Sequence, residues 1–166
     1  DYFSTVMFDE TYAQRDGTIT RRLNSDNGFS ATPEDWVLSG PHFFVANPLH
    51  QTPMRICNTH RAYEKPDLET LPEDYLPRTN YRPMADKAEY LRRTPRVCWV
   101  EEGKTQGKPV TEFFRHVHRR AIGSASERTA CASVLPPKAT HIDGVFSITF
   151  KSLLEHVNFS IGMSSV

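Results

Sequence analysis

The sequence predicts an α+β fold, a single mixed domain of short strands and a few helices. Residues 145–150 alternate at the period of a strand, so we expect Phe146, Ile148 and Phe150 to face the core. Residues 111–122 instead show the spacing of an amphipathic helix, with aromatic and aliphatic side chains on one face. A chain of 166 residues with a hydrophobic content of 38% is long and apolar enough to bury one core.

The first third of the chain predicts short elements separated by turns. Asp16-Gly17 favours a tight turn because glycine adopts the positive φ that such turns need. Thr32-Pro33 favours a helical turn, with Thr as the cap and Pro at the first helical position. The expected elements are a strand or short helix over 1–13, a turn over 14–17, a strand over 18–20, a loop over 24–30, a helical turn over 32–35, strands over 36–38 and 42–45, and a helical turn over 52–57.

The rest of the chain begins with a proline-rich segment, residues 66–83, that predicts a long loop because proline lacks a backbone donor. Met84, Ala88 and Leu91 then follow the spacing of an amphipathic helix. The remaining expected elements are a strand over 97–100, a glycine-rich turn over 101–109, the helix over 111–122, strands over 129–135 and 145–150, and a helix from Lys151 onward.

Several global features narrow the class of protein. The chain does not begin with Met and its last predicted helix reaches the end, so we expect residues 1–166 to be part of a larger protein, cut at the C-terminus. The three cysteines are widely spaced and odd in number, which fits a reducing cytoplasm. There is no apolar stretch of about 18 residues, so no membrane span is expected. The 20 basic and 20 acidic residues balance, so any nucleic-acid contact must depend on where the charges lie.

The sequence predicts no catalytic centre for methyl transfer. Ala46-Asn47-Pro48-Leu49-His50 superficially resembles the motif with which adenine methyltransferases grip a flipped base. It lacks the second proline and the stacking aromatic residue, and no glycine-rich strand–turn–helix precedes it. We interpret it as a turn, and we expect neither a cofactor site nor a metal site within this chain.

The sequence also contains two patterns that suggest a metal site. Asp67, followed downstream by Glu102 and Lys104, matches the loose pattern of restriction nucleases, in which two carboxylates hold magnesium and a lysine helps to orient water. Three residue types at free spacing also occur by chance. His116 and His118 could suggest a metal, but two positions apart on a helix they point in different directions.

The arginine-rich segments are the better candidates for function. Arg115, Arg119 and Arg120, together with His116 and His118, give the predicted helix a basic face that could lie along phosphates. A solvated surface helix is the alternative.

The segment from Pro77 to Pro83 presents Arg78, Asn80, Tyr81 and Arg82 between prolines. Arginine suits guanine, asparagine suits adenine, and tyrosine can stack on a base. In the alternative interpretation Tyr81 packs inward and the arginines pair with acidic neighbours, namely Asp74, Asp86 or Glu89.

Three long strings carry a resemblance to a known family. They are Trp36-Val-Leu-Ser-Gly-Pro-His-Phe-Phe-Val-Ala-Asn-Pro-Leu49 with Thr52-Pro53, then Tyr75-Leu-Pro-Arg-Thr-Asn-Tyr-Arg-Pro83, and Glu127-Arg-Thr-Ala-Cys-Ala-Ser-Val-Leu-Pro-Pro137 with His141-Ile142 and residues 145–151. Together they resemble the target-recognition region that follows the catalytic domain in large bacterial type IIG-like adenine-specific restriction–modification methyltransferases. The similarity runs from about Gly17 onward.

This resemblance implies a fragment that contacts double-stranded DNA while a separate domain of the same polypeptide binds S-adenosylmethionine and transfers the methyl group. The family's catalytic residues have no counterparts here. A nuclease unit and a structural brace for the catalytic domain are the alternatives. The residues predicted to bind DNA are Arg78, Asn80, Tyr81, Arg82, Arg115, His118, Arg119 and Arg120.

Overall fold

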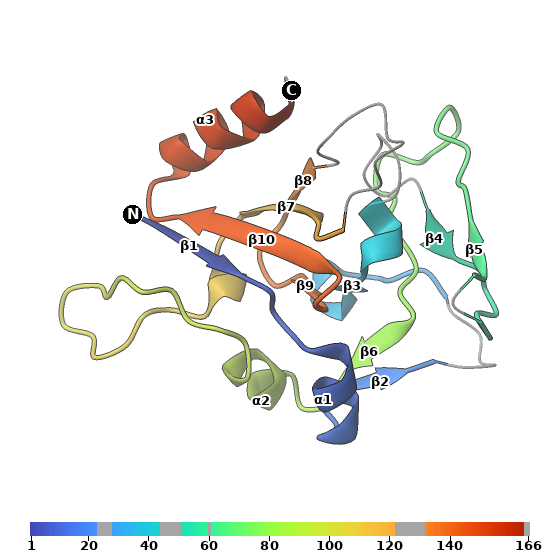
Figure 1. Cartoon of the computed structure of the whole chain (residues 1–166), viewed down its shortest axis with the longest axis horizontal. Coiled ribbons are helices and arrows are strands. Elements are labelled where there is room, and N and C mark those ends of the chain that lie inside the picture. Colours follow the sequence, from blue (N-terminus) through green and yellow to red (C-terminus); the bar gives the residue numbers. More distant parts are fainter. Residues whose placement is uncertain (23–27, 44–50, 60, 122–131, 165–166) are drawn as a thin grey trace.

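The computed structural model describes residues 1–22, 28–43, 51–59, 61–121 and 132–164. Helices and strands are mixed along the chain (Figure 1), which confirms the predicted α+β class. Within the described residues, one four-stranded sheet is accompanied by three two-stranded pairs. The predicted turn over 46–50 lies outside these residues, as do parts of the segments predicted over 24–30, 42–45 and 129–135.

The four-stranded sheet joins the two ends of the chain. Its strands are β1 (Tyr2–Thr5), β10 (Val145–Phe150), β7 (Arg115–Arg119) and β8 (Ala132–Leu135), in that spatial order. All neighbours in it are antiparallel. The first strand of the chain therefore lies beside the last strand (Figure 1).

The smaller pairs connect distant parts of the sequence. The antiparallel pairs are β2 (Ile19–Arg21) with β6 (Tyr81–Pro83) and β4 (Thr52–Pro53) with β5 (Tyr63–Glu64). The parallel pair is β3 (Val37–Leu38) with β9 (Thr140–His141). β3 separates two core clusters, because Val37 packs in one with Ile19, and Leu38 packs in the other with Val117.

The described residues form three α-helices, two of which have side-chain caps at their N-termini. α1 (Glu10–Arg15) and α2 (Lys87–Arg92) begin at Asp9 and Asp86, whose carboxylates accept backbone N–H groups of the first turn. α3 (Leu153–Ser164) lies over one face of the sheet (Figure 1). The 3₁₀ turns are η1 (Pro33–Asp35), η2 (Gly40–Phe43) and η3 (Val110–Glu112). The predicted elements at 32–35, 84–91 and 151 onward are confirmed.

The predicted helix over 111–122 is wrong. The short turn η3 occupies its start, and β7 follows it. The apolar spacing suited a helix, but His116, Val117 and His118 alternate equally well, and β7 gains hydrogen-bonded neighbours on both sides. Pairing between distant strands has overridden a local pattern that fitted two periods.

The predicted register of β10 is also wrong. Val145, Ser147 and Thr149 are the buried set, whereas Phe146, Ile148 and Phe150 are only partly buried. The aromatic members lie on the α3 side, where Phe150 packs against Phe159 with ring centroids 5.1 Å apart. A one-residue difference in register exchanges the two faces of a strand.

Three other predicted elements differ from the structure. Residues 40–43 form η2 rather than the start of a strand, and Thr52–Pro53 is a strand rather than a helical turn. Val97 and Trp99 are buried as expected, but they lie in an irregular segment with one isolated bridge at Arg96. The proline-rich segment is largely irregular, as predicted, until β6 forms at its end.

Candidate ligand-binding cleft

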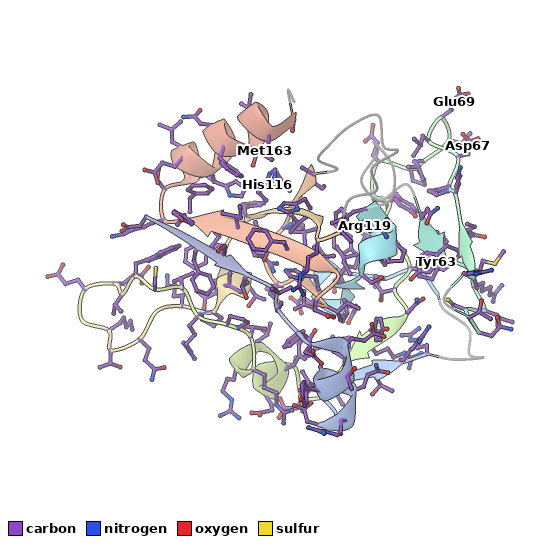
Figure 2. All side chains as sticks on the ribbon, in the orientation of Figure 1. Tyr63, Asp67, Glu69, His116, Arg119 and Met163 are labelled. Atoms are coloured by element: carbon purple, nitrogen blue, oxygen red, sulfur yellow. The ribbon has the colours of Figure 1, made fainter. Side chains whose placement is uncertain are left out.

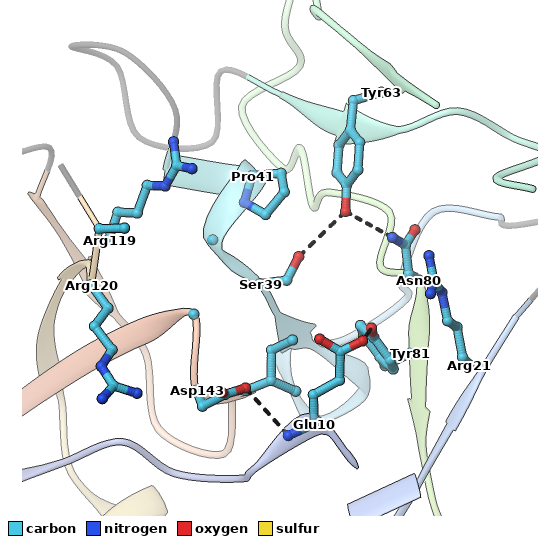
Figure 3. Close-up of a pocket in the computed structure, with 14 residues that line it drawn as sticks. Glu10, Arg21, Ser39, Pro41, Tyr63, Asn80, Tyr81, Arg119, Arg120 and Asp143 are labelled. Atoms are coloured by element: carbon cyan, nitrogen blue, oxygen red, sulfur yellow. Dashed lines mark hydrogen bonds between the residues drawn. The ribbon is translucent and has the colours of Figure 1, made fainter. Parts of the chain in front are cut away.

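A cleft of about 590 Å³ lies where β7 ends, beside the turn between β9 and β10. Figure 3 shows the residues around it. They come from α1, β2, the β3–η2 junction, β5, β6, β7 and the β9–β10 turn, so the cleft exists only after the strands have paired. Its lining residues are Glu10, Arg21, Ser39, Gly40, Pro41, Tyr63, Asn80, Tyr81, Arg119, Arg120, Ala121, Ile142, Asp143 and Gly144.

Three arginines line this cleft. Arg119 is the last residue of β7, Arg120 follows it, and Arg21 ends β2. Arg119 and Arg120 lie on one side of the cleft and Arg21 on the other (Figure 3). Within the described part of the chain, neither Arg21 nor Arg120 forms an ion pair, and the Nε of Arg21 is buried without a hydrogen-bond partner. Two guanidinium groups thus remain available to a ligand.

Two carboxylates, those of Glu10 and Asp143, line the same cleft. The Glu10 side chain accepts a hydrogen bond from the Tyr81 hydroxyl, and Asp143 Oδ1 accepts the backbone N–H of Glu10 at 3.3 Å. These contacts hold both groups in place. The bond to Glu10 and burial raise the pKa of the Tyr81 phenol, with burial as the larger cause.

A polar wall closes another side of the cleft. The Tyr63 hydroxyl accepts a hydrogen bond from Asn80 Nδ2 at 2.7 Å and lies 3.4 Å from Ser39 Oγ (Figure 3). Asn80 is 3% exposed, and its Oδ1 has no hydrogen-bond partner among the described residues. Burial raises the pKa of Tyr63, so its hydroxyl remains protonated at neutral pH.

The contact between Ser39 and His42 is structural rather than a catalytic pair. Ser39 Oγ lies 3.2 Å from His42 Nδ1, but that nitrogen already accepts the Ser39 backbone N–H at 3.1 Å. Nε2 therefore carries the proton and donates to the Arg78 carbonyl at 2.9 Å. His42 is fully buried, and burial lowers its pKa, so the neutral ring serves to hold η2 against the segment before β6.

Two glycines allow the walls of the cleft to approach. A Cβ at Gly144 would lie 3.0 Å from the Gly40 nitrogen, and a Cβ at Gly40 would lie 3.3 Å from the Gly144 carbonyl oxygen. The same Gly40 position lies 3.7 Å from Arg119 Nε. Side chains at these positions would push η2 away from the β9–β10 turn, and so we infer that both glycines set the width of the cleft.

Four of the eight residues predicted to bind DNA line this cleft: Asn80, Tyr81, Arg119 and Arg120. The first two are buried, and Tyr81 belongs to the core, as its alternative interpretation held. Arg82 is exposed on β6 and lines a neighbouring hollow of about 350 Å³ with Arg22 and Lys87. Asn80 and Arg82 thus line two different hollows beside the β2–β6 pair.

Arg78 is engaged by other groups of the protein. Its guanidinium pairs with Glu64, rather than with any of the acidic residues named as candidates, and lies 4.0 Å from the centre of the Phe29 ring. The side chain is 13% exposed. These contacts leave little of Arg78 for a ligand.

Arg115 and His118 do not lie on the predicted basic helix face. Arg115 is fully buried and donates to the carbonyl oxygens of Ala139 and Pro136. Burial lowers its pKa to about 10. Because strand residues alternate, His118 lies on the opposite face from Arg119, where its ring packs 5.1 Å from that of Phe146. The guanidinium of Arg115 is thus enclosed by protein and is not presented on the surface as the sequence predicted.

The residues of the nuclease hypothesis are not brought together. Asp67 lies at one end of the molecule (Figure 2), and the loop that carries Glu102 and Lys104 lies at the other end (Figure 1). Among the described residues, no group of three or more His, Cys, Asp or Glu side chains is placed to hold a metal ion. His116 is buried beneath α3, and burial lowers its pKa to about 4.

Sequence reasoning missed much of the cleft. Glu10, Arg21 and Asp143 lie far apart in the sequence, and strand pairing brings them together. Two local patterns could have indicated the site. Ser39-Gly40-Pro41 and Asp143-Gly144 are both glycine turns beside a polar residue, which is where irregular backbone often forms a ligand site.

These features define a small α+β domain with an arginine-lined polar cleft. No family model, curated protein or solved structure matches the chain. None of the helices in the described ranges is long and apolar enough to cross a membrane.

Proposed function

We propose that this chain is a DNA-binding unit, the target-recognition part of a bacterial adenine-specific restriction–modification methyltransferase. The observation that carries the proposal is that Arg21, Arg119 and Arg120 all line one cleft. Their guanidinium groups are suited to phosphate oxygens and to guanine edges. The resemblance of the long sequence strings to such enzymes supports the same function.

The charge distribution suits local contact with DNA rather than binding of DNA over the whole protein surface. The chain has no net charge, so long-range attraction to DNA is weak. The cleft nevertheless concentrates three cations, and a second hollow is lined by Arg22, Arg82 and Lys87, of which Lys87 forms an ion pair with Asp35 at 2.6 Å. We therefore propose that DNA contacts this arginine-rich end of the molecule, near the end of β7.

We also propose that α3 contacts the rest of the parent enzyme. Its outer side chains Leu153, Leu154, Val157 and Ile161 are exposed, and Val157 and Ile161 line an apolar groove with Phe114 and Val134. An exposed apolar face of this kind is typical of a protein contact. We propose that it docks against the catalytic domain, which would bind S-adenosylmethionine in the bacterial cytoplasm.

The proposal is tested by DNA binding of the purified chain over a range of salt concentrations, with fluorescence anisotropy as the readout. We expect affinity to fall steeply with salt, with a slope set by the number of phosphates contacted. The variant Arg21→Ala/Arg120→Ala should lower affinity at least tenfold, because each lost contact removes about 1–3 kcal/mol. Arg92→Ala is the matched control, since Arg92 is exposed on α2.

Failure would take one of two forms. Equal loss in the control and the cleft variant would mean that the cleft is not the contact surface. No binding at low salt, together with tight association of the chain with the catalytic domain, would favour the alternative of a structural brace. Leu154→Asp would then be expected to weaken that association while leaving the fold intact, because Leu154 is 69% exposed.

A further inference from the structure

We infer that the cleft binds a guanine nucleotide held outside a base stack. The DNA setting of this inference rests on the proposed function, whereas the choice of base rests on the cleft itself. Three features carry it: the concave shape of the site, its pairing of cations with carboxylates, and the separation of its two arginine groups.

Shape comes first. The cleft is a hollow of about 590 Å³ enclosed by seven elements or turns of the chain, within the usual range of small-ligand sites, about 300–1,000 Å³. A hollow cannot enter a DNA groove, because a groove accepts a protruding helix or strand pair. It can accept a protruding group, and an extruded nucleotide is such a group.

The charges then restrict the ligand. A site for phosphate alone would not include carboxylates, which repel an anion. Here Glu10 and Asp143 share the cleft with Arg21 and Arg120, and none of these four side chains forms an ion pair with another described residue. The ligand should therefore present both acceptors and donors.

Guanine offers that combination. Its O6 and N7 are adjacent acceptors that match an arginine fork. Its N1–H and N2 amino group are adjacent donors that match a carboxylate. Thymine places carbonyl oxygens on both sides of its N–H, so a carboxylate is repelled there. Adenine offers a carboxylate one amino donor beside an acceptor nitrogen.

The positions of the side chains agree with one nucleotide. Arg120 lies on one side of the cleft and would take the phosphate. Arg21 lies on the opposite side and would face O6 and N7, with the Glu10 and Asp143 carboxylates between the two sides facing the donor edge (Figure 3). Pro41 and Ile142 supply apolar surface for the ring.

The test is a titration of the ¹⁵N-labelled chain with dGMP, dIMP, dTMP and inorganic phosphate, followed by NMR shifts of the cleft amides. dIMP lacks only the 2-amino group of dGMP, so it isolates one donor. We expect dGMP to bind about tenfold more tightly than dIMP, because a hydrogen bond to a charged group is lost. dTMP and phosphate should bind more weakly still.

Variants assign the contacts. Glu10→Gln/Asp143→Asn should abolish the preference of dGMP over dIMP while preserving the acceptor for the α1 backbone. Arg120→Ala should weaken all the nucleotides by a similar factor. Glu102→Gln, in the exposed loop at the far end, is the control and should change neither.

Each outcome separates the two proposals. If phosphate binds as tightly as dGMP, or if dIMP equals dGMP, the inference is overturned, whatever duplex DNA does. If dGMP binds selectively but duplex DNA carrying an unpaired dG does not bind, the proposed function fails and the cleft remains a guanine nucleotide site. Selective binding of both ligands, lost in the carboxylate variant, supports both proposals.

Discussion

The two ends of β7 use the same basic residue types for opposite purposes. At its start, Arg115 and His116 are enclosed, the first by backbone carbonyls and the second by the aromatic ring of Phe159. At its end, Arg119 and Arg120 open onto the cleft. The strand thus begins with a buried structural arginine and a buried neutral histidine and ends at candidate ligand-binding arginines, with Val117 buried between them.

The presence of arginine in a segment therefore does not by itself locate a binding surface. Arg115 has a guanidinium like that of Arg120, but its hydrogen-bonding capacity serves the chain between Pro136 and Ala139, just after β8. The two arginines differ in burial because of their positions along β7. Arg115 belongs to the strand, which has paired neighbours on both sides, whereas Arg120 follows the end of the strand beside the β9–β10 turn.

The largest expected effect is on stability. Arg115→Ala should lower the free energy of unfolding by about 3–5 kcal/mol, because it leaves buried carbonyl groups unpaired and creates a cavity. The change is measured by urea denaturation followed by circular dichroism. A loss below about 1 kcal/mol would contradict the structural role of this arginine.

The second prediction concerns acid. Burial lowers the pKa of His116 to about 4 and that of His141 to about 3. The unfolded chain takes up these protons near pH 6.5 while the folded chain does not, so stability is complete above that pH and falls as pH drops toward 4. Each histidine contributes a slope of up to about 1.4 kcal/mol per pH unit.

Urea midpoints at pH 7, 6 and 5 check this slope. His116→Phe keeps an aromatic ring against Phe159 and should reduce the pH dependence. His118→Phe is the matched comparison at the partly exposed position two residues along the strand. A pH dependence unaltered by His116→Phe would mean that other groups cause the acid sensitivity.

The third prediction targets the cleft end of the comparison. Gly144→Ala should cost about 1–3 kcal/mol and lower ligand affinity, because the new methyl group would lie 3.0 Å from the Gly40 nitrogen. Gly162→Ala is the control, since its Cβ would meet nothing within 4 Å and alanine favours the helix. Thermal unfolding together with the dGMP titration checks both effects, and equal behaviour of the two variants would remove the role assigned to the glycine contact.

The smallest effect on stability is expected at Arg120. Arg120→Ala should change the free energy of unfolding by less than about 0.5 kcal/mol, as surface substitutions usually do. It should nevertheless reduce the salt dependence of DNA affinity by about one unit of the logarithmic slope. Loss of stability comparable with that of Arg115→Ala would abolish the distinction between the two ends of β7.

Local sequence patterns predicted the fold class, α2, α3 and the helical turn at Pro33, because each of these depends on neighbouring residues, although the Thr32 side chain does not cap that turn. They failed for β7, whose aromatic and aliphatic spacing fitted a helix until distant strands supplied its partners. The same limit applies to the cleft. Arg119 and Arg120 were predicted on the wrong element, and Glu10, Arg21 and Asp143 were missed, because their proximity is created by pairing across the chain.

The pairing of β1 with β10 also has a consequence for how the protein is made. Tyr2 lies opposite Phe150, and Val37 lies opposite Thr140, so each partner is synthesised more than a hundred residues after the first strand. Contacts so distant in sequence slow folding, because a long loop must close before they are gained. During translation β1 and β3 remain unpaired until β10 and β9 have been synthesised. The cleft, with walls from residues near Glu10 and near Asp143, should therefore form late in folding.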